Sequence, residues 1–379
     1  MFLVFGERRG GNNVYALDVS DPNNPLIQWY IGPDVVGFSE MGQSWCIPVF
    51  GRVAYGNKLV VFLSGGYDTN QDNDPVTGPD SMGRGIYVVD LLSGGLVWKY
   101  THENDSNMQF SIPSDIAAID TTDNGFIDRL YVGDMGGRLW RFDITNVDPT
   151  KWTGKILFKS NILIIPGEPR RKIFYPPDVV QEEGYEFVFF GTGDRANPKN
   201  ETVINQIYAV KDRNDNVNLD ESTLVDVTSD LLQESDDETL KTQIRNDLES
   251  SEGWYISLAD NLGEKVLAPS LVFANTAYLT TFTPTTSGGG DPCVLSEGTA
   301  RLYALNYKTG EAVLDYDTSD DAVGKTDRSL VIGSSIPSGL VMAIIRGKPV
   351  GYVGVRGGIL KPAIGTVSAI NTIFWRQLE

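Results

Sequence analysis

The sequence LYVGDMGGRLWRFDI (residues 130–144) decides the fold. Apolar and polar residues alternate on both sides of a turn that contains Asp134, Gly136 and Gly137, which is the pattern of a β-hairpin. Related hairpin patterns recur along the chain. They are VYALDVSDPNNPLIQWY (14–30), IYVVDLLSGGLVWKY (86–100), LYALNYKTGEAVLDY (302–316) and a weaker copy, IYAVKDRNDNVNL (207–219). We interpret their aromatic residues as packing between neighbouring sheets.

Further strand pairs lie between these hairpins. They are KLVVFLSGGYD (58–68), FVFFGTGDR (187–195), LVFANTAYLTTFTP (271–284) and KPVGYVGVRGGI (348–359). Irregular repeats of a four-stranded unit predict an all-β fold, a six- to seven-bladed β-propeller. The hairpins resemble the blades of quinoprotein propellers. A chain of 379 residues is long enough for two domains, but we predict a single propeller over residues 1–379.

Two segments depart from the repeat. Residues 215–248 are acidic, contain no Gly and space their leucines and isoleucine as a helix does. They predict a short helical insertion on the surface. Residues 317–328 predict a polar loop.

The charge and the termini limit the possible partners. A net charge of −19 repels nucleic acid and anionic lipid, so we expect no nucleic-acid partner. The acidic surface either attracts divalent cations or is simply solvated.

No apolar run of 18 residues occurs, so we expect no membrane-spanning segment. Residues 1–11 lack the pattern of a signal peptide, and we interpret the chain as part of a longer exported protein.

Histidine and cysteine are scarce. His102 is the one histidine and has no nucleophile motif beside it, so we interpret it as a loop residue. Cys46 and Cys293 lie far apart in the sequence and match no zinc spacing. They either pair in an oxidising compartment or are two unrelated thiols.

The sharpest chemical signal is AAIDTTDNGFIDRLYVGD (117–134). Calcium loops place oxygen ligands at positions 1, 3, 5 and 9, use Gly at position 6 for the turn, and offer the carbonyl of position 7. Gly125 occupies position 6 here. The predicted calcium (Ca²⁺) ligands are Asp120, Thr122, Asn124, Phe126 (carbonyl) and Asp128. The alternative is a hairpin turn rich in Asp and Asn that binds no ion.

Two weaker acidic loops share part of this spacing. The first, residues 67–74, has Asp68, Asn70, Asp72 and Asp74 at alternate positions but no turn Gly. The second, residues 212–220, matches the spacing but has Val217 at the Gly position. For both we favour a solvated loop over an ion site.

Several segments together resemble the C-terminal propeller of PilY-type proteins, which lie at the tip of type IV pili. The most specific is SDIAAIDTTDNGFIDRLYVGDMGGRLWRFDIT (114–145). The others are GGNNVYALDVSDPNNPLIQW (10–29), FVFFGTGDR, GEKVLAPSLVFANTAYLTTFTP (263–284), DPC (291–293), GTARLYALNYKTG (298–310), IPSGLVMAII (336–345) and FWRQ (374–377). Thr122 departs from the family pattern, where an acidic residue is usual.

The resemblance implies a non-enzymatic, calcium-binding module of an exported protein at the cell surface or pilus tip. It implies pilin or minor pilins as partners, attachment to a host or abiotic surface, and calcium control of pilus retraction. Two alternatives stay open. One is a quinoprotein-like dehydrogenase, which the separation of Cys46 and Cys293 disfavours because such enzymes carry adjacent cysteines. The other is a scaffold propeller that binds protein or glycan.

Overall fold

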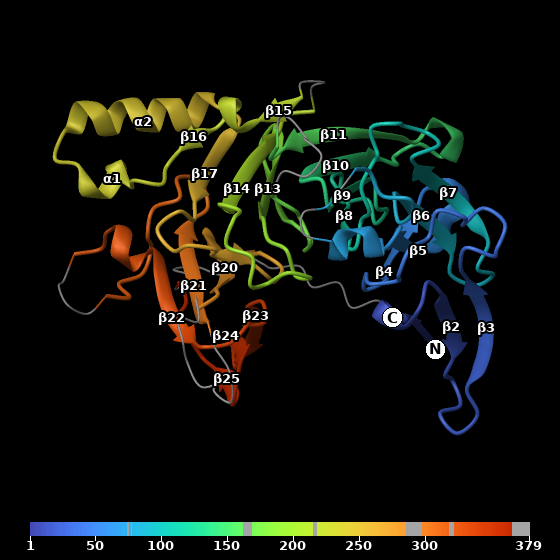
Figure 1. Cartoon of the computed structure of the whole chain (residues 1–379). Coiled ribbons are helices and arrows are strands. Elements are labelled where there is room, and N and C mark those ends of the chain that lie inside the picture. Colours follow the sequence, from blue (N-terminus) through green and yellow to red (C-terminus); the bar gives the residue numbers. More distant parts are fainter. Residues whose placement is uncertain are drawn as a thin grey trace.

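The computed structural model describes residues 1–73, 76, 78–161, 169–214, 218–285, 298–317 and 322–365. In this part of the chain the strands form six small sheets (Figure 1), so the prediction of an all-β propeller is confirmed. The first sheet contains β1 (Phe2–Gly6), β2 (Val14–Asp18) and β3 (Leu26–Ile31). The second contains β4 (Val49–Val53), β5 (Lys58–Ser64), β6 (Gly85–Asp90) and β7 (Leu96–Thr101).

The middle sheets each gain a short parallel strand from a distant part of the chain. The third sheet has the order β15 (Leu219–Asp220), β11 (Thr153–Lys159), β10 (Arg138–Asp143), β9 (Arg129–Gly133) and β8 (Ala117–Ile119). The fourth has the order β12 (Asp178–Glu182), β13 (Tyr185–Gly191), β14 (Gln206–Asp212), β17 (Gly253–Ser257) and β16 (Val225–Asp226).

The last two sheets complete the series. The fifth contains β18 (Lys265–Val266), β19 (Leu271–Phe273), β20 (Thr276–Thr283), β21 (Thr299–Asn306) and β22 (Ser329–Gly333). The sixth contains β23 (Val341–Ile345), β24 (Lys348–Val355) and β25 (Gly358–Leu360). Short 3-10 helices lie at η1 (Arg8–Gly10), η2 (Tyr55–Asn57), η3 (Thr69–Asp72), η4 (Pro149–Lys151), η5 (Glu221–Thr223) and η6 (Lys325–Arg328).

The period-two alternation of the strands explains how the sheets stack. Successive side chains of a strand point to opposite faces, so each inner sheet packs against two neighbours. Leu130 and Val132 of β9 join the core shared with the second sheet, whereas Tyr131 joins the core shared with the fourth. Trp140, fully buried, and Tyr303 lie in such cores as well, which confirms their interpretation as packing residues.

Two of the predicted hairpins are wrong in their second halves. In residues 302–316 only β21 is a strand, and the following segment makes a single bridge from Leu305 to Ala312. The far edge of β21 is instead taken by β22. In residues 207–219, β14 does not pair with β15, because β15 runs parallel to β11 of the preceding sheet.

The helical insertion is shorter than predicted. Its helices are α1 (Leu231–Glu234) and α2 (Glu238–Ser250), at the left of Figure 1, and the described residues before them include β15 and β16. Asp237 caps α2 by accepting hydrogen bonds from the backbone of Thr239 and Leu240. The predicted polar loop at 317–328 ends in η6, where Asp327 and Arg328 are buried rather than solvated.

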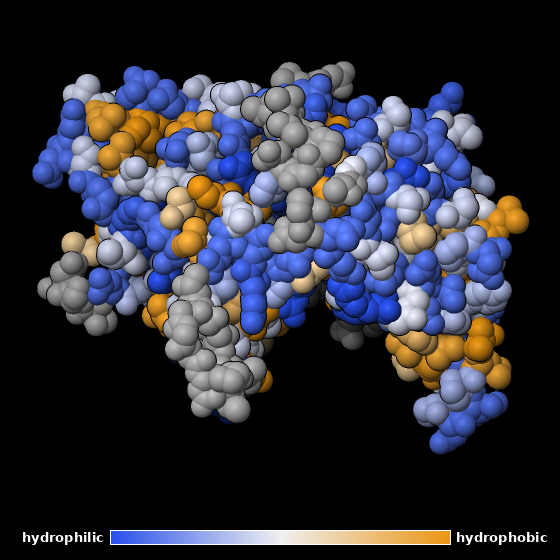
Figure 2. All heavy atoms as spheres, viewed as in Figure 1, coloured by the Kyte–Doolittle hydropathy of each residue, from blue (hydrophilic) through white to orange (hydrophobic). Residues whose placement is uncertain are grey.

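The first and sixth sheets are not paired with each other in the described part of the chain. They form two separate arms at the lower side of Figure 1. Each has one covered and one open face, and the open faces carry apolar side chains. These include Leu3, Phe5, Ile27 and Tyr30 on the first sheet and Val341, Ile345 and Ile359 on the sixth. Figure 2 shows apolar residues gathered over the arm formed by β1, β2 and β3.

Candidate metal-binding loop

The predicted calcium loop is the connection between β8 and β9. The two strands pair antiparallel from Ile119 and Arg129 outward, so the loop closes a hairpin at the edge of the third sheet. Gly125 has a φ of 86°, a left-handed conformation that glycine adopts without steric cost. Asp123 also has a positive φ, of 53°, and its side chain is exposed. The loop therefore has the turn at position 6 that its sequence predicts.

The carboxylate of Asp120 organises the first half of the loop. Its Oδ1 accepts hydrogen bonds from the backbone N–H groups of Thr122 at 3.2 Å and Asn124 at 3.1 Å. Its Oδ2 accepts from the N–H of Gly125 at 2.6 Å. These bonds fold the backbone around one carboxylate, so that the carboxylate lies on the inside of the turn.

Asp128 closes the loop from the other end. It is 3% exposed, and its Oδ1 accepts hydrogen bonds from the backbone and hydroxyl of Thr121 at 3.0 and 2.8 Å. The Thr122 hydroxyl donates to Oδ2 of Asp128 at 3.2 Å and also lies 3.5 Å from Oδ1 of Asp120. Three of the five predicted ligands therefore meet at one hydroxyl group.

The other two predicted ligands lie on the outer part of the turn. The side-chain oxygen of Asn124 accepts a hydrogen bond from the N–H of Phe126 at 2.9 Å. This contact directs the amide oxygen toward the loop backbone. The structure places Asn124 and Phe126 in the same turn as the carboxylates, and Asn124 contacts Asp120 through its backbone N–H, whereas its side-chain oxygen is directed to Phe126.

The donor set of the loop fits a hard cation. Every predicted ligand is an oxygen, the type of ligand that calcium takes, and two of them are carboxylates. The neighbouring cation, Arg129, does not neutralise them, because it forms ion pairs with Asp143 at 3.3 Å and with Glu186. Across the described ranges, no three His, Cys, Asp or Glu side chains gather as a metal cluster. A metal site here depends on neutral oxygens as well as acids.

The first weaker candidate, residues 67–74, is a structural turn in its described part. Asp68 is 4% exposed and caps η3 by accepting from the N–H of Asn70. It also accepts from the backbone of Ser81 and Met82 and from the Ser81 hydroxyl. Burial alone would raise the pKa of Asp68, but these hydrogen bonds outweigh it and lower the pKa. Asp72 forms a bidentate ion pair with Arg9, and Asp74 lies outside the described residues.

The second weaker candidate, residues 212–220, likewise uses its acids within the protein. Asp212 is 1% exposed and accepts two hydrogen bonds from Arg141, at 2.7 and 2.9 Å, and one from the Tyr131 hydroxyl at 2.7 Å. Asp220 caps η5. Val217 lies outside the described residues. These contacts support the solvated-loop interpretation only for Asp220, because Asp212 is buried in an ion pair that the sequence did not predict.

The comparison with known protein families decides the identity of the fold. Residues 1–246 match the family described as the PilY1 beta-propeller domain. The chain belongs to this family. The predicted resemblance to PilY-type proteins is therefore confirmed.

Curated relatives of the PilY1 family are longer than this chain. It is 26% identical over 348 residues to a type IV pilus biogenesis factor PilY1 homolog from Xylella fastidiosa, covering 82% of this chain and 22% of that protein. It is also 26% identical over 356 residues to type IV pilus biogenesis factor PilY1 from Pseudomonas aeruginosa, covering 81% and 29%. The chain thus spans less than a third of these relatives.

A solved PilY1 structure shares the fold. The Pseudomonas aeruginosa PilY1 C-terminal domain superposes with a TM-score of 0.67 at 19% identity, covering 95% of this chain and 79% of that one. Saccharomyces cerevisiae Sqt1 superposes with a TM-score of 0.51 at 11% identity, covering 95% and 68%. Among the described residues of this PilY1-family chain, no helix is long and apolar enough to cross a membrane.

The scarce reactive residues have ordinary environments. His102 contacts the Met108 carbonyl through Nδ1 at 3.0 Å. Cys46 is buried at 5% exposure, and burial raises the pKa of its thiol. Cys293 lies outside the described residues, so a disulfide between the two cysteines stays untested.

Proposed function

We propose that this chain is the calcium-binding β-propeller of a type IV pilus biogenesis protein, with the ion bound in the loop from Asp120 to Asp128. Membership of the PilY1 β-propeller family supports the pilus context. The observation that carries the calcium assignment is the convergence of Asp120, Thr122 and Asp128 on one point of a turn. The remaining ligands are the side-chain oxygen of Asn124 and the carbonyl of Phe126.

The loop contacts both neighbouring sheets, which gives ion binding a route to the rest of the propeller. The N–H of Ile127 donates to the carbonyl of Arg52 in β4 at 2.7 Å. The carbonyl of Thr121 accepts from the side chain of Gln181 in β12 at 2.6 Å. A bound cation neutralises two carboxylates and fixes the turn between these contacts. Calcium should therefore stabilise the packing of the third sheet against the second and fourth.

The cellular role follows as part of the same proposal. The chain acts without catalysis, as part of an exported protein at the cell surface or pilus tip. It contacts pilin or minor pilins, supports pilus assembly and attachment to a host or abiotic surface, and couples calcium to pilus retraction. The names of its relatives as pilus biogenesis factors support this role.

Calcium titration by calorimetry tests the binding step. We expect the wild type to release or absorb heat at micromolar to millimolar calcium and its melting temperature to rise with the ion. Asp120→Ala and Asp128→Ala should both lose this response. Asp105→Ala is the matched control, because Asp105 also accepts a backbone hydrogen bond in a turn, from Asn107. If the wild type shows neither a heat of binding nor a shift in melting temperature at millimolar calcium, the calcium assignment is wrong. The alternative of a scaffold propeller without a metal role then stands.

A pilus-retraction assay tests the cellular step. A strain that carries Asp120→Ala in the full-length protein should assemble pili whose retraction no longer changes with external calcium. Unchanged calcium dependence in this strain contradicts control of retraction by the loop, even if calorimetry has shown that the loop binds the ion.

A further inference from the structure

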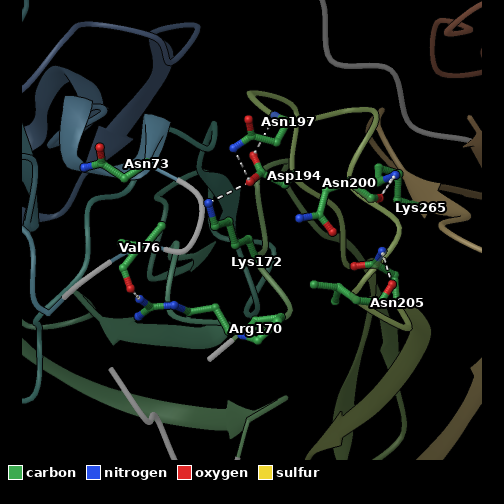
Figure 3. Close-up of a pocket in the computed structure, with 11 residues that line it drawn as sticks. Asn73, Val76, Arg170, Lys172, Asp194, Asn197, Asn200, Asn205 and Lys265 are labelled. Carbon is green, nitrogen blue, oxygen red and sulfur yellow. Dashed lines mark hydrogen bonds and ion pairs between the residues drawn. The ribbon is translucent and has the colours of Figure 1, made fainter. Parts of the chain in front are cut away.

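A second polar site lies in a small surface pocket that shares no residue with the metal loop. Its walls come from four parts of the chain. They are the connection from η3 to β6, the segment before β12, the connection from β13 to β14, and β18. Figure 3 shows Arg170 and Lys172 on one side of this hollow and Asn200, Asn205 and Lys265 on the other.

The charge of the pocket is opposite to that of the whole chain. Among the described residues that line it, Arg170, Lys172 and Lys265 are cationic and Asp194 is a carboxylate. The chain as a whole has a net charge of −19. All three cations are at least nine-tenths buried, with exposures of 8%, 5% and 1%. Buried charges are normally paired, so this excess of positive charge requires an explanation.

Arg170 has the least compensated charge of the three. Its Nη2 donates to the carbonyl of Val76 at 3.2 Å, and its Nη1 has no hydrogen-bond partner among the described residues. The guanidinium lies 4.6 Å from the centre of the Phe110 ring. Burial lowers the pKa of Arg170, and the positive charge of Arg138 lowers it further. The carboxylates of Asp80 and Asp134 raise this pKa, but they do not offset the effect of burial. The protein therefore holds a buried guanidinium for which its described residues supply no direct counterion.

The two lysines differ in their partners. Lys172 donates to Oδ2 of Asp194 at 2.7 Å, an ion pair that accounts for the carboxylate among the described lining residues. Lys265 donates to the carbonyls of Pro198, Asn200 and Gly263, at 2.8, 2.9 and 2.5 Å. These dipoles solvate the ammonium but do not neutralise it. Burial lowers the pKa of Lys265 to about 8, although Asp194 and Glu201 favour its charged form, so Arg170 is the cation of the pocket that the described carboxylates compensate least.

We propose that this pocket binds a small oxyanion, a carboxylate or phosphate group, that supplies the missing counter-charge. A guanidinium and an ammonium are the groups that recognise such oxygens, through charge-assisted hydrogen bonds. Three asparagine side chains that line the pocket, Asn197, Asn200 and Asn205, provide polar contacts for the rest of the ligand. Arg170 and Lys172 contact the anion, and Lys265 attracts it through its charge. This site is independent of the proposed calcium function.

Titration with two probes tests the proposal. Inorganic phosphate and malonate are each added to the wild type at pH 7.5, without added calcium, and ionic strength is held constant with potassium chloride. We expect at least one probe to bind in calorimetry and to raise the melting temperature. Binding of phosphate alone assigns a phosphoryl ligand, and binding of malonate alone assigns a carboxylate. If neither probe binds, the proposal is wrong.

Variants locate the binding site. Arg170→Gln and Lys172→Gln should each weaken binding at least tenfold. Arg52→Gln removes an exposed arginine and should leave binding unchanged. Asp128→Ala should also leave it unchanged, which separates this pocket from the metal loop. Equal binding by the wild type, Arg170→Gln and Lys172→Gln would show that the anion binds elsewhere and would overturn the proposal.

Discussion

The hydroxyl of Thr122 lies 3.2 Å from Oδ2 of Asp128, although the two residues are six positions apart. The same hydroxyl lies 3.5 Å from Oδ1 of Asp120. A neutral group thus occupies the point where the loop brings its two carboxylates together. In calcium loops this third position commonly carries an acid, which adds charge to the ligand set. The geometry therefore allows a direct test of how the missing charge sets affinity.

Thr122→Asp should tighten calcium binding about tenfold, which corresponds to about 1.4 kcal/mol. The substitution adds a third carboxylate at the position nearest to both existing ones. Without calcium the same variant should melt at a lower temperature than the wild type, because three like charges then repel one another. Calorimetry and thermal unfolding, each with and without the ion, measure both effects.

Thr122→Val is the matched control, since it keeps the β-branched shape and removes only the hydroxyl. It should weaken calcium binding. If the aspartate and valine variants both bind as the wild type does, position 122 is not a ligand and the ion, where bound, uses other oxygens.

Asp68→Asn should lower stability without changing calcium affinity. Asp68 accepts hydrogen bonds from Asn70, Ser81 and Met82, and an amide offers these N–H donors one acceptor oxygen instead of two. A buried donor that loses its partner costs about 1–3 kcal/mol. Urea unfolding measures the loss, and calcium titration of the same variant provides the comparison. A large fall in calcium affinity would instead make residues 67–74 an ion site.

The repeat was readable from the sequence because its strands alternate apolar and polar residues. Leu130, Tyr131 and Val132 belong to a predicted hairpin, and the structure buries all three because their strand has a sheet packed on each face. Pairing partners were less predictable. Residues 302–316 and 207–219 carry hairpin patterns, but the edge of β21 is occupied by β22 and β15 joins β11. Local sequence patterns do not determine which distant strand pairs with the edge of a given sheet.

Among the polar sites too, local features could be predicted from the sequence and long-range contacts could not. A turn with Gly at the sixth position is local, so the loop from Asp120 to Asp128 could be predicted from the sequence. The ion pair of Arg141 with Asp212 joins residues 71 positions apart, and Arg170 meets Val76 across 94. Spacing gives no signal for such contacts. The one available signal was an arginine at an alternating position within an apolar strand, as Arg141 is in β10.

Arg141→Met should destabilise the protein by about 3–5 kcal/mol, because it leaves the buried carboxylate of Asp212 without its cation. The Tyr131 hydroxyl, which also donates to Asp212, does not carry a compensating charge. The double variant Arg141→Met with Asp212→Leu should recover much of the loss, since no buried charge then lacks a partner. Urea unfolding of the four proteins forms a double-mutant cycle. Purely additive losses would argue that the pair contributes no coupling between the third and fourth sheets.

Asp230 gives the protein a pH dependence opposite to that of most carboxylates. It is 2% exposed, and burial raises its pKa from 3.8 to about 6, although Arg328 lies 3.1 Å away and lowers it. Lys325 also lowers the pKa, whereas Glu311 and Glu234 raise it. Because the folded pKa is above the unfolded value, the contribution of Asp230 to stability is full below about pH 4 and is lost as the pH rises through 6.

Comparison with Asp230→Asn isolates this contribution. Asparagine resembles the protonated carboxyl and tolerates the left-handed backbone at this position, where φ is 52°. At pH 4 the two proteins should have similar free energies of unfolding. Between pH 4 and 7 the wild type should lose on the order of 2–3 kcal/mol relative to the variant. Chemical unfolding at several pH values measures the difference. A wild type that gains stability over the variant as the pH rises would show that Arg328 outweighs burial.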